Sequence, residues 1–511
     1  MKALWGAAAI VIAIALSLTA WTQWNMPQIP LTIGITGGWG TLHPALQHSA
    51  YGDCVLTNQF EPLLRTGRNG VIEPLAAKSW EISPDRRVYR FTIDVKRRFS
   101  DGSRLKAGDF KRSWEEGVNM APISSNSAGL DVLGGIVGFS HREKAGAIEG
   151  IRALSDEVLE IEFASPVRMV LEHLCGVRFA AFKMSRGRPI GTGTHVLIGK
   201  GRTLTMRPNP HYAIPNEELR ALRMIEIRPE DVLSFLESGR IDGALFASTS
   251  YLGGRAKAGR GKIRILYGQE ANHVMVATNG LPGRTLSDRR LRQAIQALIW
   301  RKLTSNGVPE ALAANHFVLD PQSLLAFQAG RLSAASARRK IDEGSRHIPD
   351  LIKSSLRHPL RVVSGRDVEW LISLLRDSGV SIAENSGKLP FDEILRIIYK
   401  THSADLLYGS FTVDNGDPDG LYHILGKDGA IHSPMMARPR VEALMGAGRS
   451  LLDAPELDPH YRKVSEAILE DVPYIHLGYS HETIAFNSDR IAVAATFASR
   501  NNSRVTIFQP L

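Results

Sequence analysis

The chain has 511 residues and a mass of 56.1 kDa, with 43% hydrophobic and 22% charged residues. This composition is typical of globular proteins and excludes a disordered chain, and at about 150 residues per domain the length excludes a single ordinary domain. The net charge of +10 is compatible with nucleic-acid binding, but the basic clusters 95–99 and 288–292 lie inside amphipathic segments. Such clusters are better explained as solvated faces, and we expect no nucleic-acid partner.

The first 30 residues are predicted to be a signal peptide or an N-terminal anchor. Lys2 is followed by an uncharged run over residues 3–24, a pattern typical of a secretory signal peptide. Cleavage after Ala20 would place Leu18 where a small residue is preferred, and about 18 apolar residues suffice to span a bilayer. Cleavage and anchoring therefore both stay open, and in either case we expect an exported protein that works in the periplasm.

Two cysteines, Cys54 and Cys175, lie far apart in the sequence. In an oxidising compartment they can form one disulfide. Two separate buried thiols are the more frequent outcome for such a pair. The sequence favours the thiols and leaves the disulfide open.

The first half of the chain is predicted to be rich in strands. Residues 31–35 form a short strand, and the alternation of apolar and polar residues around the turn 83–85 indicates a hairpin. A helix that carries Phe110 and Trp114 at i, i+4 spacing follows. The later elements are a strand–turn–strand over 147–163, a strand over 203–209, and a helix and strand over 227–245.

The second half alternates helices and strands. The clearest helix follows Ser287, its predicted N-cap, and shows one apolar stripe: Leu291, Ala294, Ile295, Leu298 and Ile299. In residues 320–358 the sequence indicates a surface helix with charged loops, and we assign this region no function. Beyond them we expect strands 360–364, 380–384 and 404–411 and helices 366–378 and 391–400. Such alternation indicates α/β units with a partly parallel sheet.

Common catalytic and metal-binding motifs are missing from the sequence. It contains no Gly-x-Ser-x-Gly and no His-Glu-x-x-His. Ser480, His481 and Glu482 are consecutive in a predicted strand, where neighbouring side chains point to opposite faces. We therefore expect no enzyme, no catalytic residue, no metal and no cofactor.

One loop places three aspartates within six positions: Asp414, Asp417 and Asp419. Carboxylates this close repel one another unless cations or hydrogen-bond donors lie among them. Residues 415–426 match a calcium-binding loop at positions 1, 3, 5 and 6, but Pro418 stands at position 4, and Gly426 replaces the bidentate glutamate at position 12. This disfavours calcium and leaves a turn held by local hydrogen bonds or a binding loop.

Five segments, in order along the chain, resemble one known family. They are 75–115 with its Leu-Ala-x-x-Trp, Phe-x-Asp-Gly and Ala-x-Asp patterns, 189–212 with Gly-Thr-Gly and Asn-Pro-x-Tyr, the turn 236–245, the helix 286–303, and the aspartate loop 414–420. The family is that of the dipeptide- and oligopeptide-binding proteins of bacterial ABC importers, solute-binding family 5. The aspartate loop is most similar to the dipeptide-binding branch.

The resemblance implies an α/β, two-lobed periplasmic-binding-protein fold, class II-like, with mixed sheets flanked by helices, an extra inserted domain and a ligand cleft between the lobes. The boundaries it implies are 31–55, 186–270 and 485–511 for the first lobe, 56–185 for the inserted domain and 271–484 for the second lobe. The lobes would be joined by crossings near 269–279 and 475–487 and would close on a ligand.

The function implied by the resemblance is capture of a di- or oligopeptide by a monomer that delivers it to the permease subunits of an ABC importer. In the family the residue at the position of Asp414 pairs with the peptide α-ammonium, and such a charge-assisted bond is strong. The further site residues that it implies are Asp417 or Asp419 as second choices for that role, Asn415, Phe411 as an apolar wall, and Gln47, His48, Ser49 and Tyr51 in the first lobe. The arginine for a peptide carboxylate is not placed, with Arg361 and Arg366 as candidates.

Two alternatives remain at this point. Members of the same family carry nickel complexes, haem, sugars or opines, so the same fold with a non-peptide ligand is the first alternative. An exported hydrolase is the alternative of another class.

Overall fold

The fold is described from a computed structural model of the chain. The residues described are 30–47, 49–67, 71–120, 135–139, 146–199, 201–212, 219–246, 262–309, 312, 317–322, 330–412, 417–427, 429, 432–452, 454–493 and 508–510. The predicted leader lies outside these residues.

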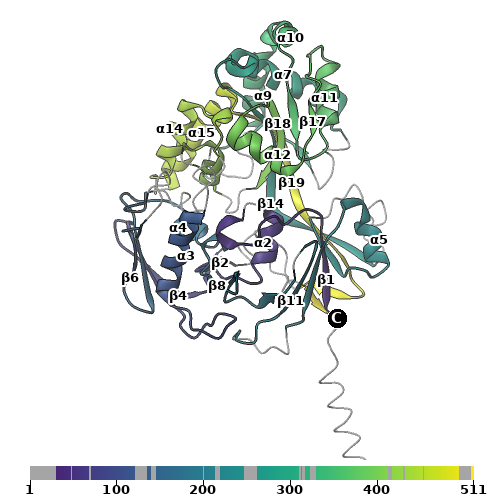
Figure 1. The fold of residues 1–511 in the computed structure, drawn as a ribbon. Coiled ribbons are helices and arrows are strands. Elements are labelled where there is room, and N and C mark those ends of the chain that lie inside the picture. Colours follow the sequence, from purple (N-terminus) through teal and green to yellow (C-terminus); the bar gives the residue numbers. More distant parts are fainter. Residues whose placement is uncertain are drawn as a thin grey trace, which may run out of the picture.

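Two bodies, one above the other in Figure 1, are joined by two long strands. These strands are β14 (Ile263–Thr278), with 16 residues, and β19 (Tyr474–Asn487), with 14 residues. They pair with each other in antiparallel fashion along most of their length, and the pairing shifts register between Tyr267 and Ala271. They lie at the positions where the family resemblance implies the two crossings.

One eleven-stranded mixed sheet runs through both bodies by way of β14 and β19. In the lower body it contains β10 (His195–Leu197), β11 (Thr203–Pro208), β12 (Leu222–Glu226), β1 (Leu31–Ile35) and β13 (Gly243–Leu245). In the upper body it contains β18 (Leu406–Thr412), β16 (Val362–Ser364), β17 (Gly387–Lys388) and β15 (Val318–Leu319). The pairs β1–β12, β1–β13, β16–β17 and β16–β18 are parallel, which confirms the predicted partly parallel sheet.

The first lobe is the part of the lower body built on β1 and β10–β13. Its strands bury a core that includes Ile33, Leu204 and Met224. The helices α2 (Ala50–Leu56) and α5 (Val232–Glu237) belong to it, with the short helices η1 (Pro44–Leu46) and η5 (Pro229–Asp231).

The inserted domain is the other part of the lower body, with a core of its own. Its antiparallel sheet has the order β4 (Ala77–Ile82), β5 (Val88–Ile93), β7 (Val158–Glu162) and β6 (Ile151–Ala153). Helix α3 (Ala107–Met120), which the sequence predicted, covers this sheet with Phe110 and Trp114, and both side chains are fully buried. Its further elements are β2 (Leu64–Thr66), β3 (Ile72–Pro74), α4 (Val170–His173), η3 (Val177–Phe179), β8 (Lys183–Ser185) and β9 (Arg188–Ile190).

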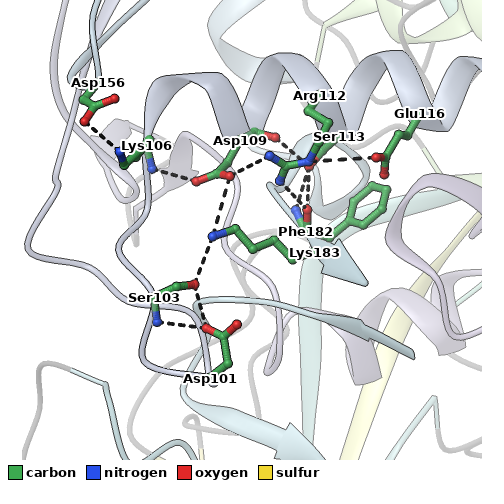
Figure 2. Close-up of polar contacts among 10 residues, drawn as sticks. All are labelled: Asp101, Ser103, Lys106, Asp109, Arg112, Ser113, Glu116, Asp156, Phe182 and Lys183. Carbon is green, nitrogen blue, oxygen red and sulfur yellow. Dashed lines mark hydrogen bonds and ion pairs between the residues drawn. The ribbon is translucent and has the colours of Figure 1, made fainter. Parts of the chain in front are cut away.

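A network of polar side chains ties α3 to β8, and Figure 2 shows it. The Asp109 carboxylate accepts from Nη1 of Arg112 at 2.8 Å and lies 3.8 Å from Nζ of Lys183. Lys183 also donates to Oγ of Ser103 at 2.9 Å, and Ser103 donates to Asp101 at 2.6 Å. The aspartates of the Phe-x-Asp-Gly and Ala-x-Asp patterns, Asp101 and Asp109, thus belong to the network that connects α3 to β8.

A second buried network joins the inserted domain to the Gly-Thr-Gly and Asn-Pro-x-Tyr segments. The side chain of Glu61 is fully buried, and its carboxylate accepts from Nη1 of Arg97 at 2.6 Å. It also accepts from the hydroxyls of Thr192 and Tyr212, each at 3.1 Å. These sequence motifs therefore have a structural role.

The second lobe is the upper body. Its helices are α7 (Arg289–Asn306), α9 (Ala334–Glu343), α10 (Ile348–Arg357), α11 (Glu369–Arg376), α12 (Phe391–Arg396), α13 (Tyr422–Leu425), α14 (Pro439–Gly448) and α15 (Ala454–Asp471), with η6 (Thr285–Ser287), η7 (Gly344–His347), η8 (Ile397–Thr401), η9 (Pro418–Leu421) and η10 (Pro434–Met436). The predicted apolar stripe of α7 is buried in the largest core of this lobe. Outside it, β20 (Ile491–Val493) pairs with β21 (Phe508–Pro510).

Two sequence predictions in this lobe were wrong. The N-cap of α7 is Asp288 rather than Ser287, because the Asp288 carboxylate accepts from the N–H of Arg290 at 2.8 Å, and a negative charge there also favours the helix dipole. Residues 380–384 do not form a strand, since within them only Ile382 makes a bridge, to Leu360, and the regular pairing with β16 begins beyond them at β17.

Candidate functional site

The aspartate loop begins where β18 ends, at the junction of the two bodies. Thr412, the last residue of β18, pairs with Asn272 of β14, beside the register shift at which β14 passes into the first lobe. The carboxyl end of β18 therefore points toward the first lobe. Asp414 and Asn415 lie outside the described residues, so their predicted role stays a prediction.

Phe411, the predicted apolar wall, is half-buried near the end of β18. It packs against the second-lobe cluster that contains Leu421 and Ile424, and its ring centroid lies 6.4 Å from that of His423. One side of the ring is therefore held by the core. Contact with a ligand stays a prediction.

Asp417 is the N-cap of the short helix η9, and its side chain is engaged by the chain itself. Its carboxylate accepts from the N–H of Asp419 at 2.8 Å and pairs with Nη1 of Arg168 from the inserted domain. Burial raises the pKa of Asp417, and the attraction of Arg168 opposes this rise. The hydrogen bond from the N–H of Asp419 is the local bond expected of a turn. The ion pair is different, because Arg168 belongs to another domain.

Asp419 is fully buried beside Arg449 and His173. Its carboxylate lies 3.4 Å from Nε of Arg449 and 3.5 Å from Nε2 of His173. Burial opposes ionisation, but Arg449 and His173 outweigh it and hold the pKa of Asp419 below its ordinary value. Asp417 and Asp419 therefore have partners within the chain, and neither needs a bound ligand or calcium to balance its charge.

Arg168 was not recognised from the sequence. It is 8% exposed and also donates from Nη2 to the hydroxyl of Tyr461 at 2.7 Å. Its backbone N–H donates to the carbonyl of Arg449 at 3.0 Å. Arg168 and Asp417 stand 249 positions apart, and no local pattern of residues connects them.

In the first lobe, Gln47 is buried and its side chain is used to hold its own loop. Its Nε2 donates to the carbonyls of Trp39 at 2.8 Å and Thr41 at 2.7 Å. Its Oε1 accepts from the N–H of Ser49 at 2.7 Å. The ligand roles predicted for Gln47 and Ser49 stay predictions, and His48 lies outside the described residues.

Tyr51 presents a fixed aromatic ring in the same stretch. Its ring packs edge-to-face against Phe246, with centroids 4.7 Å apart. A Cβ atom on Gly37 would lie 2.4 Å from the ring, so only glycine allows this close approach. Tyr51 is half-buried, and its contact with a ligand stays a prediction.

The two candidate arginines differ in their surroundings. Arg361 donates from Nη1 to Oγ of Ser403 at 2.7 Å. Arg366 is exposed, and no ion pair joins its guanidinium to another residue of the described ranges. Because β16 and β18 are parallel, Arg366, two residues beyond β16, lies at the same sheet edge as the end of β18.

Cys54 and Cys175 are both free and buried. Burial raises the pKa of the Cys175 thiol to about 12. The favoured prediction of two separate thiols is confirmed.

Two features are absent from the described ranges. These ranges contain no helix that is both long and apolar enough to cross a membrane. The same residues contain no group of three His, Cys, Asp or Glu side chains placed to hold a metal ion.

Comparison with known proteins gives a consistent result. The model of the family described as "Bacterial extracellular solute-binding proteins, family 5 Middle" matches residues 71–331. Protein XP55 of Streptomyces lividans is 25% identical in an alignment of 478 positions that covers 88% of this chain and 83% of that protein.

Solved structures match with low identity over nearly the whole chain. AgaA of A. tumefaciens R10, in complex with agropinic acid, matches with a TM-score of 0.78 at 17% identity over 94% of this chain and 99% of its own. The murein tripeptide binding protein MppA of Escherichia coli matches with a TM-score of 0.77 at 17% identity over 94% and 98%. An unliganded open form of MppA matches with a TM-score of 0.62 at 18% identity over 94% and 96%. These likenesses confirm the two-lobed fold.

Proposed function

Because the chain belongs to the bacterial extracellular solute-binding proteins of family 5, we propose that it is the exported substrate-binding component of an ABC importer. It captures a small peptide between its two lobes, as a monomer, and delivers it to the permease subunits at the membrane. Lobe closure forms the surface that the permease recognises, so the free energy of ligand binding favours the delivery-competent state.

What supports the peptide assignment is that Arg366 and the start of the aspartate loop lie at the same end of the second-lobe sheet. Arg366 follows β16, the aspartate loop follows β18, and these parallel strands end at the same edge. The pairing of Thr412 with Asn272 turns that edge toward the first lobe. A short peptide is a zwitterion, and such an edge supplies a cation for its carboxylate and an anion for its amine.

Within the loop we assign the amine-binding role to Asp414. Asp417 and Asp419 are the second choices, but both are already engaged: the former by Arg168, the latter by Arg449 and His173. Asp414, with Asn415 beside it, remains the first choice. Arg366 is assigned to the peptide carboxylate, because Arg361 is held by Ser403.

We also propose the division into 31–55, 186–270 and 485–511 for the first lobe, 56–185 for the inserted domain and 271–484 for the second lobe. Its support is the separation of the apolar cores. The inserted sheet and α3 share one cluster, β1 and β11–β13 another, and α7 with its neighbours a third.

The test is mass spectrometry of whatever co-purifies with the natively folded protein from the periplasm. Di- or oligopeptides are expected, and the dominant peptide should bind again to protein that has been unfolded, stripped and refolded. Recovery of an opine alone, the kind of ligand seen in AgaA, or of a metal complex alone would overturn the peptide assignment while leaving the capture function in place.

A further inference from the structure

The inserted domain touches the second lobe at a place remote from the strands that join them. In Figure 1, α4 of the lower body lies beneath α14 and α15, at the left of the view, whereas β14 and β19 cross near its centre. The contact at α4 therefore bridges the two bodies without any chain connection. Its residues are all among the described ones.

Arg168, two residues before α4, makes the main contact. Its Nη1 pairs with the carboxylate of Asp417, and its Nη2 donates to the hydroxyl of Tyr461 in α15 at 2.7 Å. Its backbone N–H donates to the carbonyl of Arg449, the C-cap of α14, at 3.0 Å. One residue of the inserted domain thus reaches three separate elements of the second lobe.

His173, at the end of α4, makes a second contact. Its Nε2 lies 3.5 Å from the carboxylate of Asp419, and its ring centroid lies 5.8 Å from that of His423. Because the N–H of Asp419 donates to Asp417, the two contacts share one turn of the second lobe. Both aspartates of this turn therefore face the inserted domain.

The backbone at this contact adopts a strained conformation. Met169, between Arg168 and the helix, has φ +64° and ψ +21°. This left-handed region is unfavourable for a residue with a Cβ atom, and such strain persists only where the surroundings impose it. At Met169 this conformation is imposed by the bonds of Arg168 on one side and by helix α4 on the other.

We propose that Arg168 and His173 of the inserted domain, with Asp417, Asp419 and Tyr461 of the second lobe, form a latch that holds the lobes in their closed arrangement. The contacts exist only when the two bodies are drawn together, and the lower TM-score against the open form of MppA agrees with this. The proposal deepens the proposed function, since capture requires closure, but it is testable without any ligand.

The test measures the distance between the two bodies in the full-length protein. Nitroxide labels on Lys96→Cys in the inserted domain and Glu456→Cys in α15 use exposed positions, while Cys54 and Cys175 are buried. Double electron–electron resonance gives the distance between the two labels, first in protein stripped of any bound ligand and then after addition of a tryptic hydrolysate of casein. Arg168→Gln keeps the length of the side chain and removes its charge.

In the wild type we expect a population of molecules with a short distance between the labels. In Arg168→Gln this population is expected to fall about tenfold or more, because the substitution leaves the carboxylate of Asp417 buried without its ion-pair partner. Tyr461→Phe, which removes one hydrogen bond, should shift the population less. The matched control is Arg90→Gln, since Arg90 pairs with Glu160 inside the inserted domain and should leave the distances unchanged.

A double-mutant cycle separates the pair from general damage. If Arg168 and Asp417 act together, Arg168→Gln with Asp417→Asn should open the protein no more than the stronger single variant. The latch would be overturned if the two substitutions had additive effects or if Arg168→Gln left the distances unchanged. It would also be overturned if the wild type showed no short distance either with or without the hydrolysate. A wild type whose short-distance population responds to Arg168→Gln but not to the hydrolysate would support the latch and count against peptide capture.

Discussion

The imidazole rings of His273 and His476, in the two strands that join the lobes, have their centroids 5.3 Å apart. Both side chains are buried, with 1% and 3% exposure. Burial lowers the pKa of His273 to about 4, and burial together with the proximity of His273 holds the pKa of His476 well below its ordinary value. The folded protein therefore keeps both rings neutral at the junction of its lobes.

This pair predicts acid sensitivity. Because the folded pKa of His273 lies below its unfolded value of 6.5, the pair favours folding fully above pH 6.5 and loses that contribution as the pH falls toward about 4. The loss for His273 alone is at most roughly 3 kcal/mol. Calorimetric melting temperatures should fall over this range in the wild type and less steeply in His273→Phe.

The matched control is His211→Gln, because His211 is exposed on the surface of the lower body. Its melting temperatures should follow those of the wild type at every pH. Parallel curves for the wild type and His273→Phe between pH 6.5 and 4 would show that the buried ring does not contribute.

Local patterns in the sequence predicted the elements and the fold well. The helix α7 and the partly parallel sheet depend on apolar periodicity and on turn residues, which act over a few positions, whereas the positions of the crossing strands came from the family resemblance. The predicted strand 380–384 was wrong because this segment makes only one bridge, between Ile382 and Leu360, before β17 takes up the regular pairing with β16. Register at a sheet edge is a tertiary property and leaves no local trace.

The site was predicted only in part, for the same reason. Three close aspartates indicated a need for positive charge, but Arg168 and His173 come from another domain, and Arg449 from a distant helix end. Pairing across 249 positions is set by the packing of whole domains. The sequence therefore located the charged loop without revealing which of its aspartates the chain itself occupies.

A glycine in the crossing strand predicts a sharp packing effect. A Cβ atom on Gly478 would lie 2.0 Å from the carbonyl oxygen of Val318, which belongs to β15. Gly478→Ala must displace β15 from β19, and a loss of about 1–3 kcal/mol is expected, as for other overpacked positions. Unfolding in denaturant measures the loss.

The comparison variant is Gly446→Ala in α14, where a Cβ atom would meet nothing within 4 Å. It should stabilise the protein by about 0.5–1 kcal/mol, because alanine is the better helix former. Equal stability of the two variants would contradict the close approach at Gly478.

The buried carboxylate of Glu61 predicts a large loss on neutralisation. Glu61→Gln would remove the shorter of the two ion pairs of Arg97, whose side chain is 19% exposed, and leave it only the contact with Asp94 at 3.7 Å. Breaking a buried pair costs roughly 3–5 kcal/mol. The exposed pair Arg65–Glu73 provides the control. Glu73→Gln should cost about 1 kcal/mol or less, and losses of similar size in the two variants would refute the structural role of Glu61.

The last prediction concerns the amine-binding role proposed for Asp414. Asp414→Asn keeps the shape of the side chain and removes its charge, so the affinity for the peptide identified by mass spectrometry should fall by roughly 2–5 kcal/mol. N-acetylation of that peptide should weaken binding to the wild type by a similar amount and binding to Asp414→Asn far less, because the variant has already lost the ionic term. Asp417→Asn separates the two aspartates: if Asp417 acts through Arg168, it should weaken the free and acetylated peptides equally. Calorimetry that shows the acetylation effect vanishing in Asp417→Asn but persisting in Asp414→Asn would assign the amine to Asp417 instead.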